Sequence, residues 1–230
     1  MKLLIGLDDT DNHESRGTGH LARQIAALLA QSNTLLGVTR HQLLIDPRVP
    51  YTSHNSSAAI HLETEDGVDL SGLFAQVSKF MLADFQPGSD PGLCIVAGEV
   101  PEAIIEFGRR VQNEVVTQSQ ARDLASTFDL RLQGLGGSED GLIGALAAVG
   151  LAASGDDGRY LLVGKIRELA GLQPVQALLS AGVVAVKTLD GKPVDEGMVL
   201  ADKLRPARRA GMPVQFVDWQ VDHWRPLKLD

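Results

Sequence analysis

Close to its N-terminus the chain reads Leu3-Leu4-Ile5-Gly6-Leu7-Asp8-Asp9-Thr10-Asp11, an apolar run that leads directly into three carboxylates. This pattern predicts a short buried strand that ends in an acidic loop. Carboxylates crowded at a strand end repel one another and lose solvation, so their charge needs an offset. A hard cation such as Mg²⁺ provides one, because it binds one or two carboxylates together with phosphate oxygens of a substrate. The alternative is a solvated acidic turn in which Asp9 or Asp11 caps a backbone N–H group.

A helix start is expected directly after the acidic loop. Apolar residues recur at helical spacing between positions 21 and 30, so a helix should begin near Thr18 or Gly19, with Thr18 as its N-cap. The glycines at 17 and 19 let the backbone approach a ligand closely. Because free N–H groups at a helix start attract phosphate oxygens, Gly17, Thr18 and Gly19 are candidate phosphate-binding residues. A capped helix start without a ligand is the alternative.

Two further loops carry candidate residues. The polar loop of residues 46–57 contains Arg48, which could meet a phosphate or remain solvated, and it leads into an expected strand at residues 58–63. The turn of residues 134–141 is rich in glycine and precedes an apolar helix, so the backbone at Gly136 and Gly137 could line a phosphate site. Close packing of that small-residue helix against a neighbouring backbone is the alternative. The turn matches neither a P-loop nor a dinucleotide-binding fingerprint.

The order of elements predicts an α/β (α+β) fold. Strands and helices alternate up to residue 128, and the pattern from Leu130 onward is compatible with a ferredoxin-like sandwich. With 230 residues the chain is long enough for two domains, which we place at residues 1–127 and 128–230.

Composition narrows the function classes. The single cysteine, Cys94, excludes an intramolecular disulfide and a cysteine-rich zinc site, and the longest apolar run, at residues 141–153, is too short to span a bilayer. We therefore expect a cytoplasmic protein without membrane contact. A net charge of −8 makes nucleic-acid binding unlikely without a partner protein, and the cluster Arg205, Arg208 and Arg209 is expected to be a solvated face.

Several stretches together resemble one family, the archaeal agmatidine synthetases, which modify the wobble cytidine of an isoleucine tRNA. The resemblance rests on residues 5–11, on Pro47-Arg48-Val49-Pro50-Tyr51, on residues 141–150 and on Tyr160, and residues 205–211 also fit. It implies a kinase-like ATP-binding domain followed by a ferredoxin-like domain. It also implies that Asp8, Asp9 and Asp11 hold Mg²⁺ and ATP, and it places Thr18 where the family carries a threonine that becomes phosphorylated.

This chain departs from the family pattern at two loops. Residues 52–57 read Thr-Ser-His-Asn-Ser-Ser where the family usually has Lys-Thr-Arg-Gly-Asn-Gly, and Ser138-Glu139-Asp140 stands where the family tends to have an arginine. Loss of positive charge near phosphates weakens transition-state stabilisation or indicates a different substrate. The family's OB-fold and zinc ribbon have no counterpart in this sequence, which argues against tRNA modification by this chain alone.

The resulting hypothesis is a Mg²⁺- and ATP-dependent phosphotransfer enzyme, kinase- or ligase-like, that activates a small substrate; a homodimer is compatible with it. Asp8, Thr18 and His54 are the candidate catalytic residues, and His54 or His13 is the candidate base. Ser53, His54 and Asn55 are expected to face the acceptor, and Arg48, Asn55 and Ser56 are candidate nucleotide-binding residues. The alternatives are a nucleotide-binding regulatory module without turnover and an RNA-modification accessory that works with a separate tRNA-binding partner.

Overall fold

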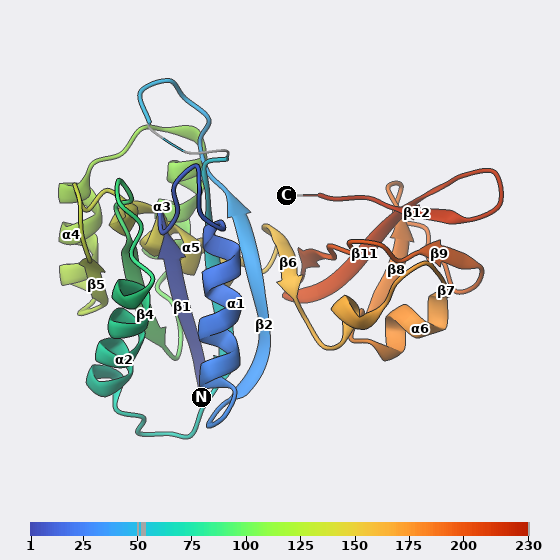
Figure 1. The fold of residues 1–230 in the computed structure, drawn as a ribbon, viewed down its shortest axis with the longest axis horizontal. Coiled ribbons are helices and arrows are strands. Elements are labelled where there is room, and N and C mark those ends of the chain that lie inside the picture. The colour runs from blue at the N-terminus through green and yellow to red at the C-terminus, as the bar shows by residue number, and fades with distance from the viewer. Residues whose placement is uncertain (50, 52–53, 230) are drawn as a thin grey trace.

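The computed structural model describes residues 1–49, 51 and 54–229. Within these residues twelve strands form one sheet, and helices cover its N-terminal half on both faces. Figure 1 shows two parts side by side: a larger N-terminal part that contains α1 to α5, and a smaller C-terminal part that begins at β6. The mixed α/β class predicted from the sequence is confirmed.

The first six elements form a βαββαβ unit. In chain order they are β1 (Lys2–Asp8), α1 (Thr18–Leu29), β2 (Thr34–Gln42), β3 (Ser56–Glu63), α2 (Leu70–Ala83) and β4 (Gly92–Ala97). All three strand pairs are antiparallel, and the order across the sheet is β4-β1-β3-β2. This is the strand order of a ferredoxin-like unit.

Alternate residues of β1 point to two separate cores. Leu3, Ile5 and Leu7 are fully buried against α1 and α2. Residues of the opposite face lie under α5 (Gly141–Ser154) and α3 (Glu102–Asn113). Gly6 lies so close to α5 that an added Cβ atom would be 2.0 Å from the carbonyl oxygen of Ala145. The small residues of α5 therefore allow the close approach to a neighbouring backbone that the sequence suggested.

Three elements around the predicted domain boundary pack with one another and with the N-terminal part. β5 (Arg131–Gly134) pairs with β4, and α5 packs against β1, β3 and β4. α4 (Gln118–Thr127), which begins with a capping box at Thr117, contacts β5 and α5. The expected division at residue 127 thus falls between α4 and β5, which contact each other. The ferredoxin-like order expected after residue 128 is formed instead by residues 2–97.

The C-terminal part consists of short strands around one short helix and has its own apolar core. β6 (Arg159–Leu162) pairs with β2 on one side and with β10 on the other, and so joins this part to the larger one. The remaining elements are a 3-10 turn η1 (Ile166–Glu168), β7 (Leu172–Pro174), α6 (Val175–Ser180), β8 (Ala185–Thr188), β9 (Met198–Leu200), β10 (Ala207–Arg209), β11 (Met212–Trp219) and β12 (Trp224–Pro226).

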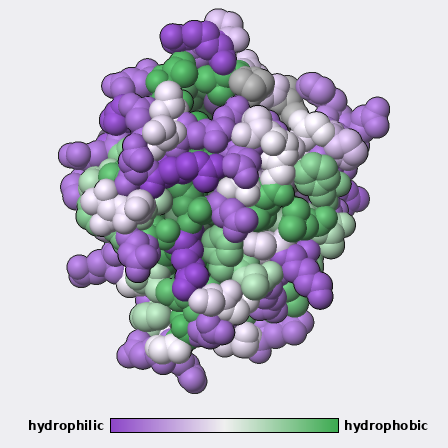
Figure 2. Space-filling view, turned by 90° about the vertical axis from the view of Figure 1, so that its left-hand side faces the viewer, coloured by the Kyte–Doolittle hydropathy of each residue, from purple (hydrophilic) through white to green (hydrophobic). Residues whose placement is uncertain are grey.

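Apolar side chains are distributed between a buried core and a mixed surface. Figure 2 looks at the side that carries α2, α4 and β5, where apolar residues lie interspersed among hydrophilic ones. Within the described ranges, no helix combines the length and the apolar character needed to cross a bilayer. Cys94 is buried in the core, and burial raises the pKa of its thiol to about 12, so it is not a reactive nucleophile.

Candidate functional site

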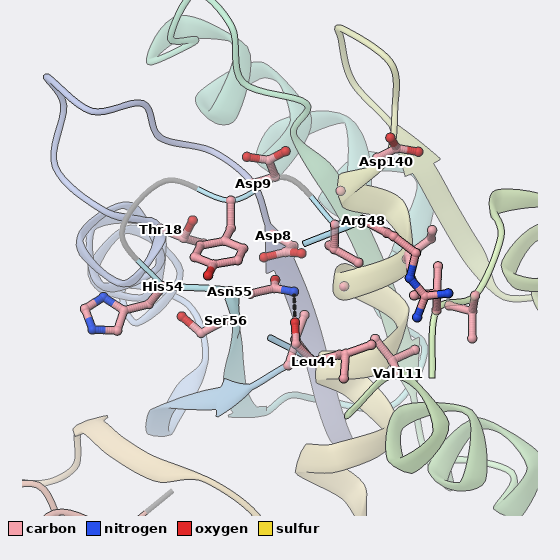
Figure 3. A pocket seen from close by; sticks show the side chains of 18 of the residues that line it. Asp8, Asp9, Thr18, Leu44, Arg48, His54, Asn55, Ser56, Val111 and Asp140 are labelled. Carbon is pink, nitrogen blue, oxygen red and sulfur yellow. Dashed lines mark hydrogen bonds between the residues drawn. The ribbon is translucent and has the colours of Figure 1, made fainter. Parts of the chain in front are cut away.

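One pocket collects most of the residues predicted from the sequence, and we call it the acidic pocket. It lies between the loop after β1, the loop that joins β2 to β3, the N-terminal turn of α5 and the residues that follow α3 (Figure 3). Its empty space, including the opening to solvent, measures about 910 Å³. The polar residues that line it are Asp8, Asp9, Asp11, Thr18, Arg48, Tyr51, His54, Asn55, Ser56, Glu114 and Asp140.

Asp8 is placed at the centre of the pocket by the close packing of β1 against α5. An added Cβ atom at Gly144 would lie 1.7 Å from Oδ2 of Asp8, so any larger residue there would displace the carboxylate. At Gly141 an added Cβ atom would lie 2.1 Å from the backbone oxygen of Asp90. The glycines of α5 therefore shape the floor of the pocket, and they set the carboxylate beside the first turn of the helix.

The carboxyl groups of Asp8 and Asp9 both have raised pKa values. Burial, followed by the charge of Asp9, raises the pKa of Asp8 to about 8, although the backbone N–H of Asp9 opposes the shift. Burial raises the pKa of Asp9 to about 6, with further contributions from the charges of Asp90, Asp11 and Asp140. A bound cation would reverse both shifts, because an opposite charge within a few ångströms favours the ionised form. A positive ligand would therefore lower the cost of ionising both side chains.

The backbone turns sharply at the end of β1. Asp9 adopts a positive φ of 49°, a conformation that aspartate tolerates better than most residues. Because of this turn, the side chains of Asp9 and Asp8 point in different directions, as Figure 3 shows. Nearby, Asp90 accepts hydrogen bonds from the backbone N–H (2.6 Å) and the hydroxyl (2.8 Å) of Ser138, which fixes the glycine-rich turn against the loop after α2.

Thr18 connects the helix start to the acidic loop through its side chain. Its hydroxyl donates to Oδ1 of Asp11 at 3.0 Å and accepts from the hydroxyl of Thr10 at 3.1 Å. The helix begins at Thr18 as predicted, but the expectation that Thr18 is the N-cap is wrong: Gly17 occupies that position without a side-chain cap. The hydroxyl satisfies a carboxylate seven residues earlier instead of the backbone N–H groups of its own helix.

The loop between β2 and β3 forms the opposite wall. Asn55 donates from Nδ2 to the carbonyl of Leu44 at 2.6 Å, the bond drawn in Figure 3, and its carbonyl accepts from the backbone N–H of Leu43 at 2.9 Å. His54 and Ser56 lie beside Thr18 in the same view. Ser53, expected to face the acceptor, and its neighbours Pro50 and Thr52 lie outside the described residues.

Arg48 lines the pocket but is engaged elsewhere. Its guanidinium donates to both oxygens of Asp46, at 2.8 Å and 2.7 Å, and its side chain is 71% exposed. These hydrogen bonds lower the pKa of the Asp46 carboxyl to about 2. The pair is a local one, formed by residues two apart. A phosphate would have to compete with Asp46 for this cation.

The predicted glycines fall outside the acidic pocket. Gly17 and Gly19 line a neighbouring pocket that shares Thr18 with the first. Gly136 lies against the ring of Phe85, and a Cβ atom at Gly137 would lie 1.8 Å from Oδ1 of Asp90. Gly136 and Gly137 are thus closely packed, and their role in phosphate binding stays a prediction.

The apolar wall of the acidic pocket was not found by sequence reasoning. It comes from the loop after β2, from α3 with the residues that follow it, and from α5, and the first two are separated by more than sixty positions in the chain. The sequence carries short apolar pairs at these places, Leu43-Leu44 and Val115-Val116, but nothing local to either pair indicates that the two meet. The residues are Leu43, Leu44, Val49, Val111, Val115, Val116 and Ile143.

The predicted metal ligands do not form a closed cage. Among residues 1–49, 51 and 54–229, no three His, Cys, Asp or Glu side chains lie close enough together to hold one metal ion. Asp11 is hydrogen-bonded to Thr18, which leaves Asp8 and Asp9 as the carboxylates that face the pocket under stress. Two carboxylates fit Mg²⁺, because this ion commonly takes one or two from the protein and the rest from water and phosphate oxygens.

The resemblance predicted from the sequence is confirmed by comparison with known proteins. No family model matches the chain. It is 24% identical over 151 residues to TiaS of Cenarchaeum symbiosum, a 2-agmatinylcytidine synthetase of an isoleucine tRNA, and 30% identical over 156 residues to TiaS of Pyrobaculum neutrophilum. Each alignment covers 65% of this chain, and 33% and 35% of the respective relative. The chain thus spans about a third of the length of the curated relatives it matches.

Solved structures show the same relationship at the level of the fold. The crystal structure of TiaS in complex with its isoleucine tRNA and ATP superposes with a TM-score of 0.58 at 24% identity, over 65% of this chain and 36% of that one. The complex of TiaS with the same tRNA, AMPCPP and agmatine gives a TM-score of 0.56 at 23% identity, over the same shares. About two thirds of the chain therefore has the fold found in these enzymes.

Proposed function

We propose that this chain binds ATP with Mg²⁺ in the acidic pocket and transfers a phosphoryl group from it to a small acceptor. The observation that carries the proposal is that one pocket combines two carboxyl groups of raised pKa, Asp8 and Asp9, with an apolar wall. The carboxylates suit a metal ion bound to a polyphosphate, and the apolar wall suits a nucleobase. The similarity to TiaS supports it, because those enzymes are solved with ATP and with AMPCPP.

Each wall of the pocket would have a separate task. Asp8 and Asp9 would hold Mg²⁺, which neutralises phosphate charge when it is bound. The nucleobase of ATP would lie against the apolar wall, which includes Leu44 and Val111 and excludes water from that side. Positioning of this kind is most of what a phosphotransfer enzyme contributes, since the reaction needs alignment and charge stabilisation rather than a covalent partner.

The polar residues opposite the apolar wall would receive the acceptor. Thr18 is held in one orientation by its bonds to Asp11 and Thr10, and it lies beside His54 and Ser56. His54 would accept the proton of the acceptor group, and Thr18 would orient that group. The relatives are solved with tRNA and with agmatine, so the earlier expectation against nucleic acid finds no support there, and either kind of acceptor is compatible with an open pocket.

A nucleotide-binding module without turnover is the second candidate, and one observation favours it. Arg48 is the pocket-lining arginine, and its guanidinium is paired with Asp46 and open to solvent. Without a cation aimed at the transferred phosphate, binding would persist while the transition state would lose stabilisation. Nucleotide binding without ADP formation in the presence of acceptors would favour this candidate.

Calorimetric titration of ATP tests the proposal on three proteins: the wild type, Asp8→Asn and Asp195→Asn. Asp195 is an exposed aspartate of the C-terminal part that does not line the pocket, so it is a control for loss of one negative charge. We expect Mg²⁺-dependent binding by the wild type and by the control, and at least tenfold weaker binding by Asp8→Asn. Equal affinity in all three proteins would place the nucleotide elsewhere, and absence of ATP binding by the wild type would refute the proposal.

A further inference from the structure

A positively charged cleft lies next to the acidic pocket, between α1 and the C-terminal part, and we call it the arginine cleft. Its floor is a second pocket lined by the start of α1, by Arg23 and Arg40, and by Leu161 of β6. The two pockets share Asp11, Thr18, His54 and Ser56. A ligand that extends from one to the other would therefore pass directly over Thr18.

Two arginines line this cleft and two more lie close to it. Arg23 of α1 and Arg40 of β2 are in its lining, Arg167 of η1 donates to the backbone carbonyl of Leu161, and Arg205 lies in the loop before β10. Burial and the charge of Arg167 lower the pKa of Arg23, and burial followed by the charges of Arg167, Arg23 and Arg159 lowers the pKa of Arg205. Arg23 and Arg205 are therefore partly desolvated, and both lie close enough to the exposed Arg167 for the charges to repel.

These three arginines bond to the protein backbone. Within the described part of the chain, Arg23, Arg167 and Arg205 form no ion pair with a carboxylate. Each donates instead to a backbone carbonyl: to Gly19 at 2.7 Å, to Leu161 at 3.3 Å and to Leu204 at 2.6 Å, respectively. A guanidinium has five N–H donors, so each arginine keeps donors for a ligand.

The start of α1 adds a second, independent feature. Gly17, its N-cap, offers no side chain, and no side-chain cap satisfies the first turn. Gly17, Thr18 and Gly19 line the same pocket as Arg23, so the positive end of the helix dipole faces the cleft. At Gly19 an added Cβ atom would lie 2.5 Å from Cδ1 of Leu161, which shows how closely α1 approaches β6. The glycine therefore allows the helix start to lie directly against β6.

We infer that the arginine cleft binds a phosphate group of the acceptor, so that the acceptor is a phosphorylated molecule that reaches Thr18 and His54 from this side. The assignment of the bound phosphate to an acceptor rests on the proposed function. The anion site itself is supported independently by the arginines, the uncapped helix start and the cavity. Arginine is suited to this ligand because its planar fork matches the geometry of phosphate oxygens. Asp11 is the acid that borders the cleft, and its hydrogen bond from Thr18 directs it toward the helix start.

Binding of inorganic pyrophosphate tests the anion site. Titrations are made at low salt with EDTA, so that no metal recruits the anion to the acidic pocket. The proteins are the wild type, Arg23→Gln, Arg205→Gln, Arg167→Gln and the control Arg109→Gln. Arg109 is an exposed arginine of α3, on the opposite face of the sheet, that pairs with Glu102. We expect at least tenfold weaker binding by each cleft variant and unchanged binding by the control.

A ten-nucleotide single-stranded RNA in a parallel titration identifies the source of the phosphate. Binding of both probes with the same dependence on the arginines indicates a nucleic-acid backbone, with an affinity that falls steeply with salt. Binding of pyrophosphate alone indicates a small phosphorylated acceptor. If the wild type binds neither probe, or if the cleft variants bind as the control does, the inference is wrong.

Two precautions keep the test decisive. Arg167 is exposed, so Arg167→Gln should keep the fold even if substitution of the half-buried Arg23 or Arg205 does not, and thermal unfolding checks each protein. Mg²⁺–ATP titration of the same variants separates the two proposals. Loss of pyrophosphate binding with retained ATP binding confirms the cleft as a distinct site, whereas failure of ATP to bind the wild type refutes the proposed function alone.

Discussion

Substitution of Asp8 by Asn should remove a pH-dependent penalty on the stability of the metal-free protein. The pKa of this carboxyl rises from 3.8 to about 8 in the folded state, mainly because of burial. Between those two values the folded chain binds a proton that the unfolded chain releases, so the free energy of unfolding falls as pH rises from about 4 to about 8. Asn has the shape of the protonated carboxyl and cannot ionise, so the variant should lack this slope.

The size of the effect follows from the shift. Each pH unit in this window corresponds to about 1.4 kcal/mol, so three units, from pH 5 to pH 8, correspond to about 4 kcal/mol at most. Asp8 is half-buried and the pocket opens to water, which screens the ionised form. We therefore expect about 2 kcal/mol for the difference between the wild type and Asp8→Asn.

Urea unfolding in EDTA at pH 5, 6, 7 and 8 measures this difference. Other groups titrate over the same range, among them Asp9, so the comparison of the two proteins, and not the slope of either one, isolates Asp8. The wild type should lose stability relative to Asp8→Asn as pH rises, and saturating Mg²⁺ should restore the wild type but not the variant. Parallel pH profiles of the two proteins would refute the reasoning.

Two further substitutions probe the packing around the site and the sheet. Gly144→Ala places a Cβ atom 1.7 Å from Oδ2 of Asp8, so it should weaken Mg²⁺–ATP binding at least tenfold in calorimetry. Overpacking costs about 1–3 kcal/mol of stability, and the higher helix propensity of alanine returns about 1 kcal/mol. A stability loss well above about 2 kcal/mol in urea unfolding would therefore contradict this account. Thr39→Val removes a buried hydroxyl that lies 2.8 Å from each of two imidazole nitrogens, and urea unfolding should show a loss of about 2–4 kcal/mol, while the exposed Thr34→Val of the same strand should show little change.

Local patterns in the sequence predicted most of the helices and strands. Apolar residues at helical spacing place α1 close to its observed position, because a helix that buries one face repeats its contacts with a fixed period. The continuous apolar run at residues 141–153 places α5, which is buried on nearly all sides. The acidic loop after β1 was also predicted, and the structure brings Asp8, Asp9, Thr18 and Asn55 to one pocket. These residues are near in sequence to glycines and strand ends, where local rules apply.

The errors concern choices between partners that local rules leave open. Thr18 was expected to cap its own helix, but its hydroxyl bonds to Asp11 and Thr10, which the turn at Asp9 brings within reach. The strand order in residues 2–97 depends on which strands pair across the sheet, and periodicity carries no information about that. The contact of Gly144 with Asp8 joins positions more than 130 residues apart, so only the packing of α5 on β1 reveals it.

The net charge of the whole chain is a weak guide to the electrostatics of a single cleft, for a physical reason. A net charge of −8 describes the field at a distance, whereas a ligand in a cleft responds to the groups within about one Debye length, about 8–10 Å. Arg205 and Arg208, expected on a solvated face, are half-buried, and Arg208 donates to the carbonyl of Ala152 at 3.1 Å. The fold gathers acids into one pocket and arginines into and beside the next, and on this ground we propose adjoining sites for a cation and for an anion in a chain of acidic composition.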